Sequence, residues 1–341
     1  MAGVPSFESL HVPAEVESDF EAACTGLAPV EGERVLGRVV QLDRSLPLVC
    51  VEGGSYRAEH TAKLVKGSET LAAIGDWVVV DFPEGHENAV ISAVLPRRNM
   101  LSRPDKGRKG RQQVLAANID TVFVVLPAPE ALASLSHLER QLTMAYQSGA
   151  DPVVVLSKAD KLPEGQLPEV LAAVARSACD VPVIAESAAT GEGVEQLASH
   201  VERGHVAALL GKSGVGKSSL LNAMLGDDLQ RTGEVREKDG KGRHTTISRR
   251  MVVLPGGGLL IDSPGLRSFL LTGSRTGVEM AFPDIQELAA CCKFRDCRHS
   301  GEPGCEVAAA VRSGELTQRR VDSYLSILSE VEHKDHPHAR V

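Results

Sequence analysis

One segment of the chain, Gly211 to Ser218 (GKSGVGKS), matches the phosphate-loop pattern G-x-x-x-x-G-K-[ST] at every position. Glycines let the backbone wrap closely around phosphates, and amide N–H groups at the start of the following helix meet their negative charge. We expect Lys217 to bridge the β- and γ-phosphates of a nucleoside triphosphate and Ser218 to ligate Mg²⁺. The apolar run HVAALL before the loop predicts a strand, and SSLLNAML after it predicts a helix, which is the setting that the loop requires.

A second phosphate-side element follows 45 residues after Lys217, where Asp262-Ser263-Pro264-Gly265 ends an apolar strand in a D-x-x-G pattern. Asp262 can hold Mg²⁺ through water, and the amide of Gly265 can sense the γ-phosphate. Between the two elements, Gly242-Arg243-His244-Thr245-Thr246 lies in a basic, glycine-containing loop. Such a loop can order around nucleotide and be released on hydrolysis, with Thr246 completing the Mg²⁺ shell.

Residues suited to guanine stand ahead of the phosphate loop. Ser157-Lys158-Ala159-Asp160 ends a valine-rich strand. The Asp160 carboxylate can accept together from the N1–H and 2-amino groups of guanine, which adenine does not offer, and the Lys158 stem can stack on the base. The Glu186-Ser187-Ala188 segment, which ends the next strand, fits a loop whose backbone amide contacts the guanine carbonyl oxygen. A helix cap at Asp160 is the simpler alternative, but the phosphate loop and D-x-x-G favour guanine recognition.

The order of these elements is informative in itself. Ordinary GTPases have the phosphate loop first and base recognition last, whereas here base recognition lies some 50 residues ahead of the phosphate loop. Circular permutation allows this order, because termini can be relocated without changing the packed sheet. The nucleotide-binding residues predicted by these motifs are Ser157, Lys158, Asp160, Ser187, Ala188, Gly211, Lys212, Ser213, Gly214, Val215, Gly216, Lys217, Ser218, Ser219, Asp262 and Gly265.

Four of the seven cysteines cluster near the C-terminus, at Cys291, Cys292, Cys297 and Cys305. Together with His299, the pattern Cys292-x₄-Cys297-x-His299-x₅-Cys305 offers three thiolates and one imidazole within 14 residues. This donor set predicts a closed tetrahedral zinc site, which would be structural because no position is left for substrate. Buried free cysteines are the alternative. In a small helical segment with little core, the metal would supply folding energy directly.

The helices and strands that position these sites are predicted to form three successive domains. Residues 33–98 contain short, valine-rich strands punctuated by glycine, proline and acids, which indicates a five-stranded barrel of the OB type, although an SH3-like barrel has similar spacing. Strands then alternate with helices over residues 116–280, which predicts an α/β domain with a mostly parallel sheet. Residues 281–341 read as a helical zinc-binding domain with a tail. We expect a flexible leader over 1–32 and a basic linker over 99–115.

Composition sets limits on partners and compartment. Net charge is −8, so the molecule as a whole does not have the charge of a nucleic-acid binder. No apolar run approaches the roughly 18 residues that span a bilayer, so we expect a cytoplasmic protein without a membrane partner. We also expect a monomer. Residues 97–111 hold seven basic residues against one acid, and residues 231–250 hold seven against three. Each run is either a solvated loop or a contact for nucleic acid. Aromatic content is only 3%, with Tyr56, Trp77 and Phe82 as the stacking candidates in the barrel.

From about residue 33 onward the sequence resembles the RsgA (YjeQ) family of bacterial GTPases that depend on the small ribosomal subunit. The resemblance rests on the OB-like start, the permuted motif order S-K-A-D, S-A-x-T-G-E-G, G-K-S-G-V-G-K-S-S, G-R-H-T-T and D-S-P-G, and the cysteine cluster. It implies GTP, GDP and Mg²⁺ as ligands, contact with the small subunit and its rRNA, and a role in late subunit maturation. The family's C-x₄-C-x-H-x₅-C spacing selects Cys292 rather than Cys291 as the zinc ligand.

Two positions need comment against the family pattern. The family usually has Asn where this chain has Ser157, and that Asn bonds the base and steadies the phosphate loop. Because Ser157 replaces it, the affinity for guanine is expected to be lower. Asp160 is still expected to discriminate guanine from adenine. Leu266 stands where many GTPases place a water-orienting Gln. By the resemblance, His244 takes that catalytic role beside Lys217; the alternative is that His244 is a loop residue contacting RNA.

The leading prediction is an RNA-stimulated GTPase that acts in subunit assembly. A metabolic P-loop kinase or ATPase would leave Asp160 and Ser187-Ala188 without a purpose. A nucleotide-gated RNA-binding module with negligible turnover is the other alternative, which the missing Gln permits.

Overall fold

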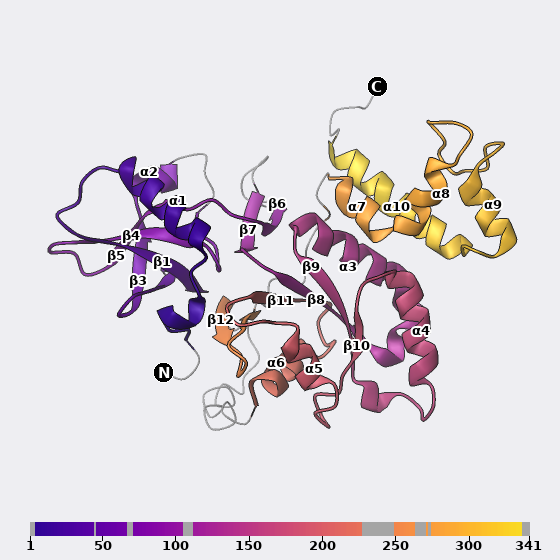
Figure 1. The fold of residues 1–341 in the computed structure, drawn as a ribbon, viewed down its shortest axis with the longest axis horizontal. Coiled ribbons are helices and arrows are strands. Elements are labelled where there is room, and N and C mark those ends of the chain that lie inside the picture. Colours follow the sequence, from indigo (N-terminus) through magenta and orange to yellow (C-terminus); the bar gives the residue numbers. More distant parts are fainter. Residues whose placement is uncertain are drawn as a thin grey trace, which may run out of the picture.

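The computed structural model describes residues 4–43, 46–66, 71–104, 112–226, 249–262, 271 and 274–335. Three regions follow one another in Figure 1: a mainly β region in indigo and purple, a central α/β region, and a helical region in orange and yellow. Within the described ranges, no helix combines the length and the apolar character needed to cross a bilayer.

The first region is a five-stranded barrel. Its strands are β1 (Gly32–Leu42), β2 (Leu48–Val51), β3 (Gly54–His60), β4 (Trp77–Pro83) and β5 (Ala89–Val94), with the short helix α2 (Ala62–Lys66) between β3 and β4. The order is β1-β2-β3-β5-β4, and β4 pairs back with β1 to close the barrel. All pairs are antiparallel except β3–β5. The valine-rich strands therefore fold as the predicted OB-type barrel, around a core that includes Val39, Val49, Val78, Val80 and Ile91.

The N-terminal segment differs from the flexible leader that its acidic composition predicts. Residues 4–31 contain a 3₁₀ turn η1 (Phe7–Leu10) and helix α1 (Ala14–Thr25). Leu10 is fully buried, and the Phe7 ring lies edge-on to Trp77 with centroids 6.5 Å apart. The prediction is thus corrected for residues 4–31: a few apolar side chains among many acids are sufficient to hold the segment on the barrel.

The expected basic linker contains a β-hairpin, formed by β6 (Met100–Pro104) and β7 (Gln112–Ala117). The hairpin lies close to the barrel, because a Cβ at Gly75 would lie 2.2 Å from the carbonyl oxygen of Ala117. Nearby, the guanidinium of Arg97 bonds the buried carboxylate of Asp76 at 2.6 Å. Residues 105–111, which carry most of the basic run, lie outside the described residues. The described part of this segment is therefore packed against the barrel and is not a free linker.

The central region is a six-stranded sheet covered on both faces. Its strands are β8 (Thr121–Pro127), β9 (Asp151–Ser157), β10 (Val183–Ala185), β11 (Val206–Leu210), β12 (Arg249–Val253) and β13 (Leu259–Asp262). They lie in the order β10-β9-β8-β11-β13-β12, all parallel except β12. Strand β12 also pairs with the end of β1, so that this sheet continues into the barrel. The alternating pattern of the sequence is confirmed as a mostly parallel sheet.

Helices α3 (Leu135–Ser148) and α4 (Leu167–Ala178) pack in one hydrophobic cluster, and α5 (Val194–Ser199) and α6 (Lys217–Leu225) in the other. Alternate residues of β8 separate the two clusters: Val122 and Val124 belong to the first, Phe123 and Val125 to the second. Short 3₁₀ turns η2 (Ala128–Glu130), η3 (Leu132–Ser134) and η4 (Ala159–Lys161) follow the ends of β8 and β9.

The C-terminal region consists of α7 (Thr276–Ala281), α8 (Pro283–Ala290), α9 (Glu306–Ser313) and α10 (Gln318–Asp335). It packs against the central region through α3 (Figure 1). Helix α7 lies close to α3, because a Cβ at Gly277 would lie 2.7 Å from the carbonyl oxygen of Thr143. Helix α10 runs alongside α3 and contributes Tyr324, whose ring packs edge-on against the buried ring of Phe282.

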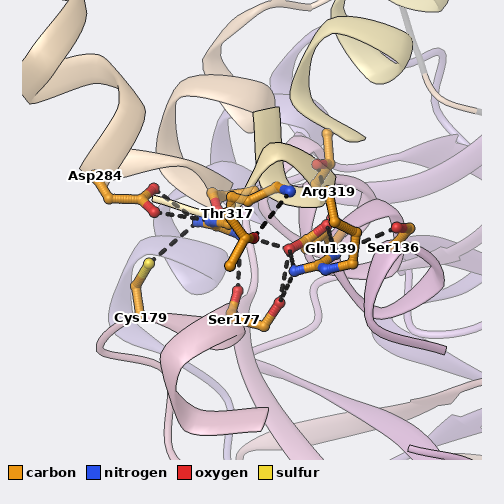
Figure 2. A network of polar contacts seen from close by, with 10 residues as sticks. Ser136, Glu139, Ser177, Cys179, Asp284, Thr317 and Arg319 are labelled. Atoms are coloured by element: carbon orange, nitrogen blue, oxygen red, sulfur yellow. Dashed lines mark hydrogen bonds and ion pairs between the residues drawn. The ribbon is translucent and has the colours of Figure 1, made fainter. Parts of the chain in front are cut away.

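A group of buried and half-buried polar residues joins the C-terminal helices to the central region (Figure 2). We call it the interface network and define it as Glu139 of α3, Ser177 of α4, Asp284 of α8, and Arg319 and Arg320 of α10. Arg319 and Arg320 each donate to Oε1 of Glu139 at 2.9 Å, and Ser177 donates to the same oxygen at 2.6 Å. Arg320 also bonds both oxygens of Asp284 at 2.7 Å.

Glu139 is fully buried and yet stays ionised. Burial by itself raises the pKa of this carboxyl group, but hydrogen bonds from Arg319 and Ser177, together with the charge of Arg320, bring the pKa below its ordinary value. The network therefore fixes the C-terminal helices against α3 with charges that are matched within the chain.

Candidate functional site

The predicted phosphate loop connects β11 to α6, as its sequence requires. Gly214 and Gly216 have φ values of +83° and +107°, a region that side-chain-bearing residues rarely adopt. Lys217 begins α6, and its ammonium group donates to the carbonyls of Gly211 and Lys212 at 2.7 and 2.6 Å. Its charge is therefore held at the loop itself, where the phosphates of a nucleotide would bind. Ser213, Ser218 and Ser219 are exposed at the same place.

The turn predicted to recognise the base is hydrogen-bonded directly to the phosphate loop. The buried hydroxyl of Ser157 donates to the carbonyl of Val215 at 2.6 Å. Its neighbour Lys158, in the left-handed conformation with φ +58°, donates its ammonium to the carbonyl of Gly214 at 2.7 Å. These contacts join residues 56 and 58 positions apart in the sequence. Ser157 therefore makes the loop-steadying bond that the family's Asn was expected to provide.

The two base-recognition turns are also bonded to each other. The Ser187 hydroxyl donates to Oδ1 of Asp160 at 2.8 Å, and the Ala159 amide donates to the carbonyl of Glu186 at 3.0 Å. Asp160 is exposed and Ala188 is half-buried. The turns follow β9 and β10, and the phosphate loop follows β11, so all three lie at the carboxyl edge of one parallel sheet. Open parallel sheets bind their ligands at this edge.

Asp262 ends β13, the strand beside β11, and therefore lies at the same edge as the phosphate loop. Its carboxylate is 3.8 Å from the guanidinium of Arg250 on β12. The remaining predicted site residues, His244, Thr246 and Gly265, lie outside the described residues. The structure thus brings together the base-side and loop residues, with Asp262 at the same edge.

One residue of the predicted base-recognition turn has a side chain to which the sequence assigned no role. Glu186, immediately before Ser187, is only 1% exposed, and its Oε2 has no hydrogen-bond partner within the described residues. Its pKa is raised to about 7. Burial is the largest cause, a hydrogen bond with the Ala188 amide acts in the opposite direction, and the nearby charge of Asp160 adds to the rise. Its sequence context, at the end of a buried strand, gave no signal of this, because glutamates at such positions are usually exposed.

The predicted zinc ligands come together between α8 and α9. The ligand atoms of Cys292, Cys297, His299 and Cys305 all lie within 4.8 Å of one another. Nδ1 of His299 lies 3.7 Å from the Cys292 sulfur and 3.5 Å from the Cys305 sulfur. The neighbouring Cys291 is exposed and is not part of the cluster. Three thiols and one imidazole at these separations suit a tetrahedral zinc ion, whose bonds to sulfur are about 2.3 Å long.

The three barrel aromatics differ in their availability for stacking. Trp77 is 3% exposed and lies beneath the guanidinium of Arg38, 4.7 Å from the ring centroid, so its selection as a stacking candidate was wrong. Tyr56 is 43% exposed and packs edge-on against the half-buried Phe82, with centroids 4.9 Å apart. Tyr56 remains as the candidate for stacking on the barrel surface.

Comparisons with known proteins agree with this geometry. A model of the RsgA GTPase family matches residues 94–272. A curated relative from Streptomyces avermitilis, the small ribosomal subunit biogenesis GTPase RsgA, is 43% identical over 321 residues, covering 94% of this chain and 85% of the relative. A similar protein of that name from Methanosarcina acetivorans is 41% identical over 304 residues, covering 88% of this chain and 80% of the relative.

Among solved structures, YjeQ from Thermotoga maritima is similar, with a TM-score of 0.64 and 27% identity, covering 88% of this chain and 99% of that one.

Proposed function

The chain belongs to the RsgA GTPase family, and from that premise we propose that it hydrolyses GTP to GDP and phosphate under stimulation by the small ribosomal subunit, in late maturation of that subunit. GTP hydrolysis is the activity of the family. The observation that carries the assignment to this site is the direct bonding of the base-recognition turn to the phosphate loop, through Ser157 to Val215 and Lys158 to Gly214. One ligand that has both a base and phosphates would span these two elements.

We assign roles by position at the sheet edge. Asp160 accepts from the two guanine N–H groups, and the Ala188 amide donates to the guanine carbonyl oxygen. The amides of residues 211–219 and the ammonium of Lys217 hold the phosphates. Ser218, Asp262 and Thr246 are proposed to hold Mg²⁺, which when bound would neutralise charge developing on the transferred phosphoryl group.

His244 is proposed to orient the attacking water, a role that rests on the G-R-H-T-T motif alone. Replacing His244 by Ala should lower phosphate release at least tenfold and leave GTP affinity nearly unchanged. If His244 instead contacts RNA, the variant would keep its basal turnover and lose only the stimulation by ribosomal subunits.

The cluster of Cys292, Cys297, His299 and Cys305 is proposed to hold one structural zinc ion. Replacing Cys297 by Ser should reduce the bound zinc and unfold the segment between α8 and α9, because metal binding supplies folding energy there. Cys291→Ser is the matched control and should keep its zinc. Full zinc retention in the Cys297 variant would count against this ligand set.

The partners are proposed to be the small ribosomal subunit and its rRNA, met by a monomer in the cytoplasm. The basic runs 97–111 and 231–250 and the exposed Tyr56 support an RNA contact, since basic side chains meet phosphate backbones with little sequence readout.

The test is phosphate release from GTP and from ATP, with and without purified small ribosomal subunits. GTP-specific release that rises strongly with subunits is the expected result, and Lys217→Ala is the control that should lack nucleotide binding. Equal use of ATP would favour the kinase or ATPase alternative. Tight GTP binding without release, even with subunits, would instead indicate a nucleotide-gated RNA-binding module.

A further inference from the structure

Glu186 lies between the two turns that the proposed function assigns to guanine. Its amide donates to the carbonyl of Leu156 at 2.8 Å, and its carbonyl accepts from the amide of Ala159 at 3.0 Å. It therefore bridges the strand before Asp160 and the turn that carries Asp160. Its side chain is 1% exposed, and Oε2 has no hydrogen-bond partner within the described part of the chain. A buried, partly unsatisfied carboxyl group is costly to keep.

The surroundings of this carboxyl group contain an acid and an amide, both of which belong to the base-recognition turns. Asp160 raises the pKa of Glu186, and the Ala188 N–H lowers it, after burial as the largest cause of the raised pKa of about 7. The nearby cation, Lys158, directs its ammonium to the Gly214 carbonyl. Among the described residues, Asp160 is thus the charged group that acts on the pKa of Glu186.

We propose that Glu186 is a positioning residue of the guanine pocket, and that the pocket accepts the base fully only when the Glu186 carboxyl group is neutral. The inference rests on the proposed function, because it takes Asp160 and the Ala188 amide as the groups that contact guanine. Glu186 acts through these two groups and not by touching the base.

Two effects of an ionised Glu186 oppose guanine binding. Its carboxylate competes with the guanine carbonyl oxygen for the N–H of Ala188. It also repels the Asp160 carboxylate, more strongly once the base has displaced water from that side chain and lowered the local dielectric. A neutral Glu186 removes the repulsion and weakens the competition, because an uncharged carbonyl oxygen is a poorer acceptor than a carboxylate. Guanine binding is therefore accompanied by uptake of a proton from solvent onto Glu186.

The test compares GDP affinity of the wild-type protein and Glu186→Gln at pH 6, 7 and 8. The variant has nearly the same shape and is permanently neutral, so the ratio of wild-type to variant Kd should be close to 1 at pH 6. At pH 8 the ratio should approach roughly tenfold, because about nine in ten Glu186 side chains are then ionised in the free protein. Titration of the GDP phosphates affects both proteins equally and cancels in the ratio.

Glu195→Gln is the matched control, since it removes an exposed acid from the adjacent helix α5 and should keep the wild-type pH profile. A second measurement follows the proton itself. Calorimetric titration with GDP at pH 7.5, in two buffers of different ionisation enthalpy, should show more net proton uptake by the wild-type protein than by the Gln variant.

A Kd ratio that stays constant from pH 6 to 8, with tight GDP binding, would overturn the role of Glu186 and leave the proposed function intact. Absence of GDP binding by the wild-type protein would overturn both. A wild-type pH profile for Glu195→Gln together with a flat profile for Glu186→Gln would support the inference.

Discussion

Glu139 and Glu186 are two buried glutamates of the same domain, with exposures of 0% and 1%, in opposite surroundings. Glu139 accepts from Arg319, Arg320 and Ser177, and these donors hold its pKa below the ordinary value although burial alone would raise it. Glu186 faces Asp160 and only a backbone amide, and burial raises its pKa to about 7. Equal burial therefore has opposite electrostatic consequences.

The difference corresponds to where the two residues lie. Glu139 belongs to the interface network, which joins α3 to the C-terminal helices, and its charge is matched within the chain (Figure 2). Glu186 lies at the carboxyl edge of the parallel sheet, where polar groups are left for a ligand. Incompletely satisfied, perturbed acids are typical of binding sites, whereas matched buried pairs serve to hold elements together.

Removing the matched charge should have the largest effect. Glu139→Gln leaves two buried or half-buried guanidinium groups short of a carboxylate, and we expect a loss of about 3–5 kcal/mol of unfolding free energy. Urea unfolding followed by circular dichroism measures it. The control is Glu330→Gln, which removes the Arg140–Glu330 pair between the same helices α3 and α10, with side chains 30% and 32% exposed. That pair should be worth less than about 1 kcal/mol; equal losses in both variants would contradict the comparison.

Removing the unmatched charge should have the opposite sign. The folded-state pKa of Glu186 lies above its unfolded value, so the folded protein binds the extra proton, and this contribution to stability is lost as pH rises toward 7. Glu186→Gln should therefore be more stable than wild type above pH 7, by up to about 3 kcal/mol, and nearly equal near pH 4.5. Thermal unfolding across pH checks this.

For Glu139 the pH dependence runs the other way. Its pKa is lowered on folding, so its contribution is present at neutral pH and is lost as pH falls through the folded-state pKa. If the stability difference from wild type changed with pH in the same direction for the Glu139 and Glu186 variants, the proposed electrostatic difference between the two sites would be wrong.

The role of Asp160 beside Glu186 is tested by base specificity. Asp160→Asn should weaken GTP binding roughly 10- to 100-fold relative to xanthosine triphosphate, because the amide donates to the 2-carbonyl of xanthine and repels the 2-amino group of guanine. Competition binding with the two nucleotides measures the ratio. An unchanged preference for GTP would show that Asp160 does not contact guanine. The proposed role of Glu186 would then also be wrong, because it depends on that contact.

The smallest effect is expected at Ser157. Ser157→Ala removes the bond to the Val215 carbonyl and should weaken GDP binding by about 1 kcal/mol, or roughly fivefold, since that buried acceptor loses its donor. Binding titration against Ser213→Ala, an exposed phosphate-loop serine whose side chain can be solvated, provides the comparison. An affinity equal to wild type would show that Ser157 does not steady the loop.

Sequence alone determined the elements whose chemistry depends on local spacing. The phosphate loop, the S-K-A-D turn and the Cys₃His spacing each need a few residues in a fixed order, and the alternation of strands and helices needs only local periodicity. The barrel, the parallel sheet and the cysteine cluster are confirmed for this reason. The placement of His244, Thr246 and Gly265 stays a prediction.

Only the tertiary structure decided which charges are matched. Glu139 meets Arg319 and Arg320 across 180 and 181 residues, and nothing in its local sequence marks it as buried. Three further findings also depend on contacts between segments that are distant in the sequence. They are the burial of Glu186, the packing of residues 4–31 on the barrel, and the burial of Trp77. Burial and charge pairing depend on surfaces that meet only after folding, so a local pattern carries no record of them.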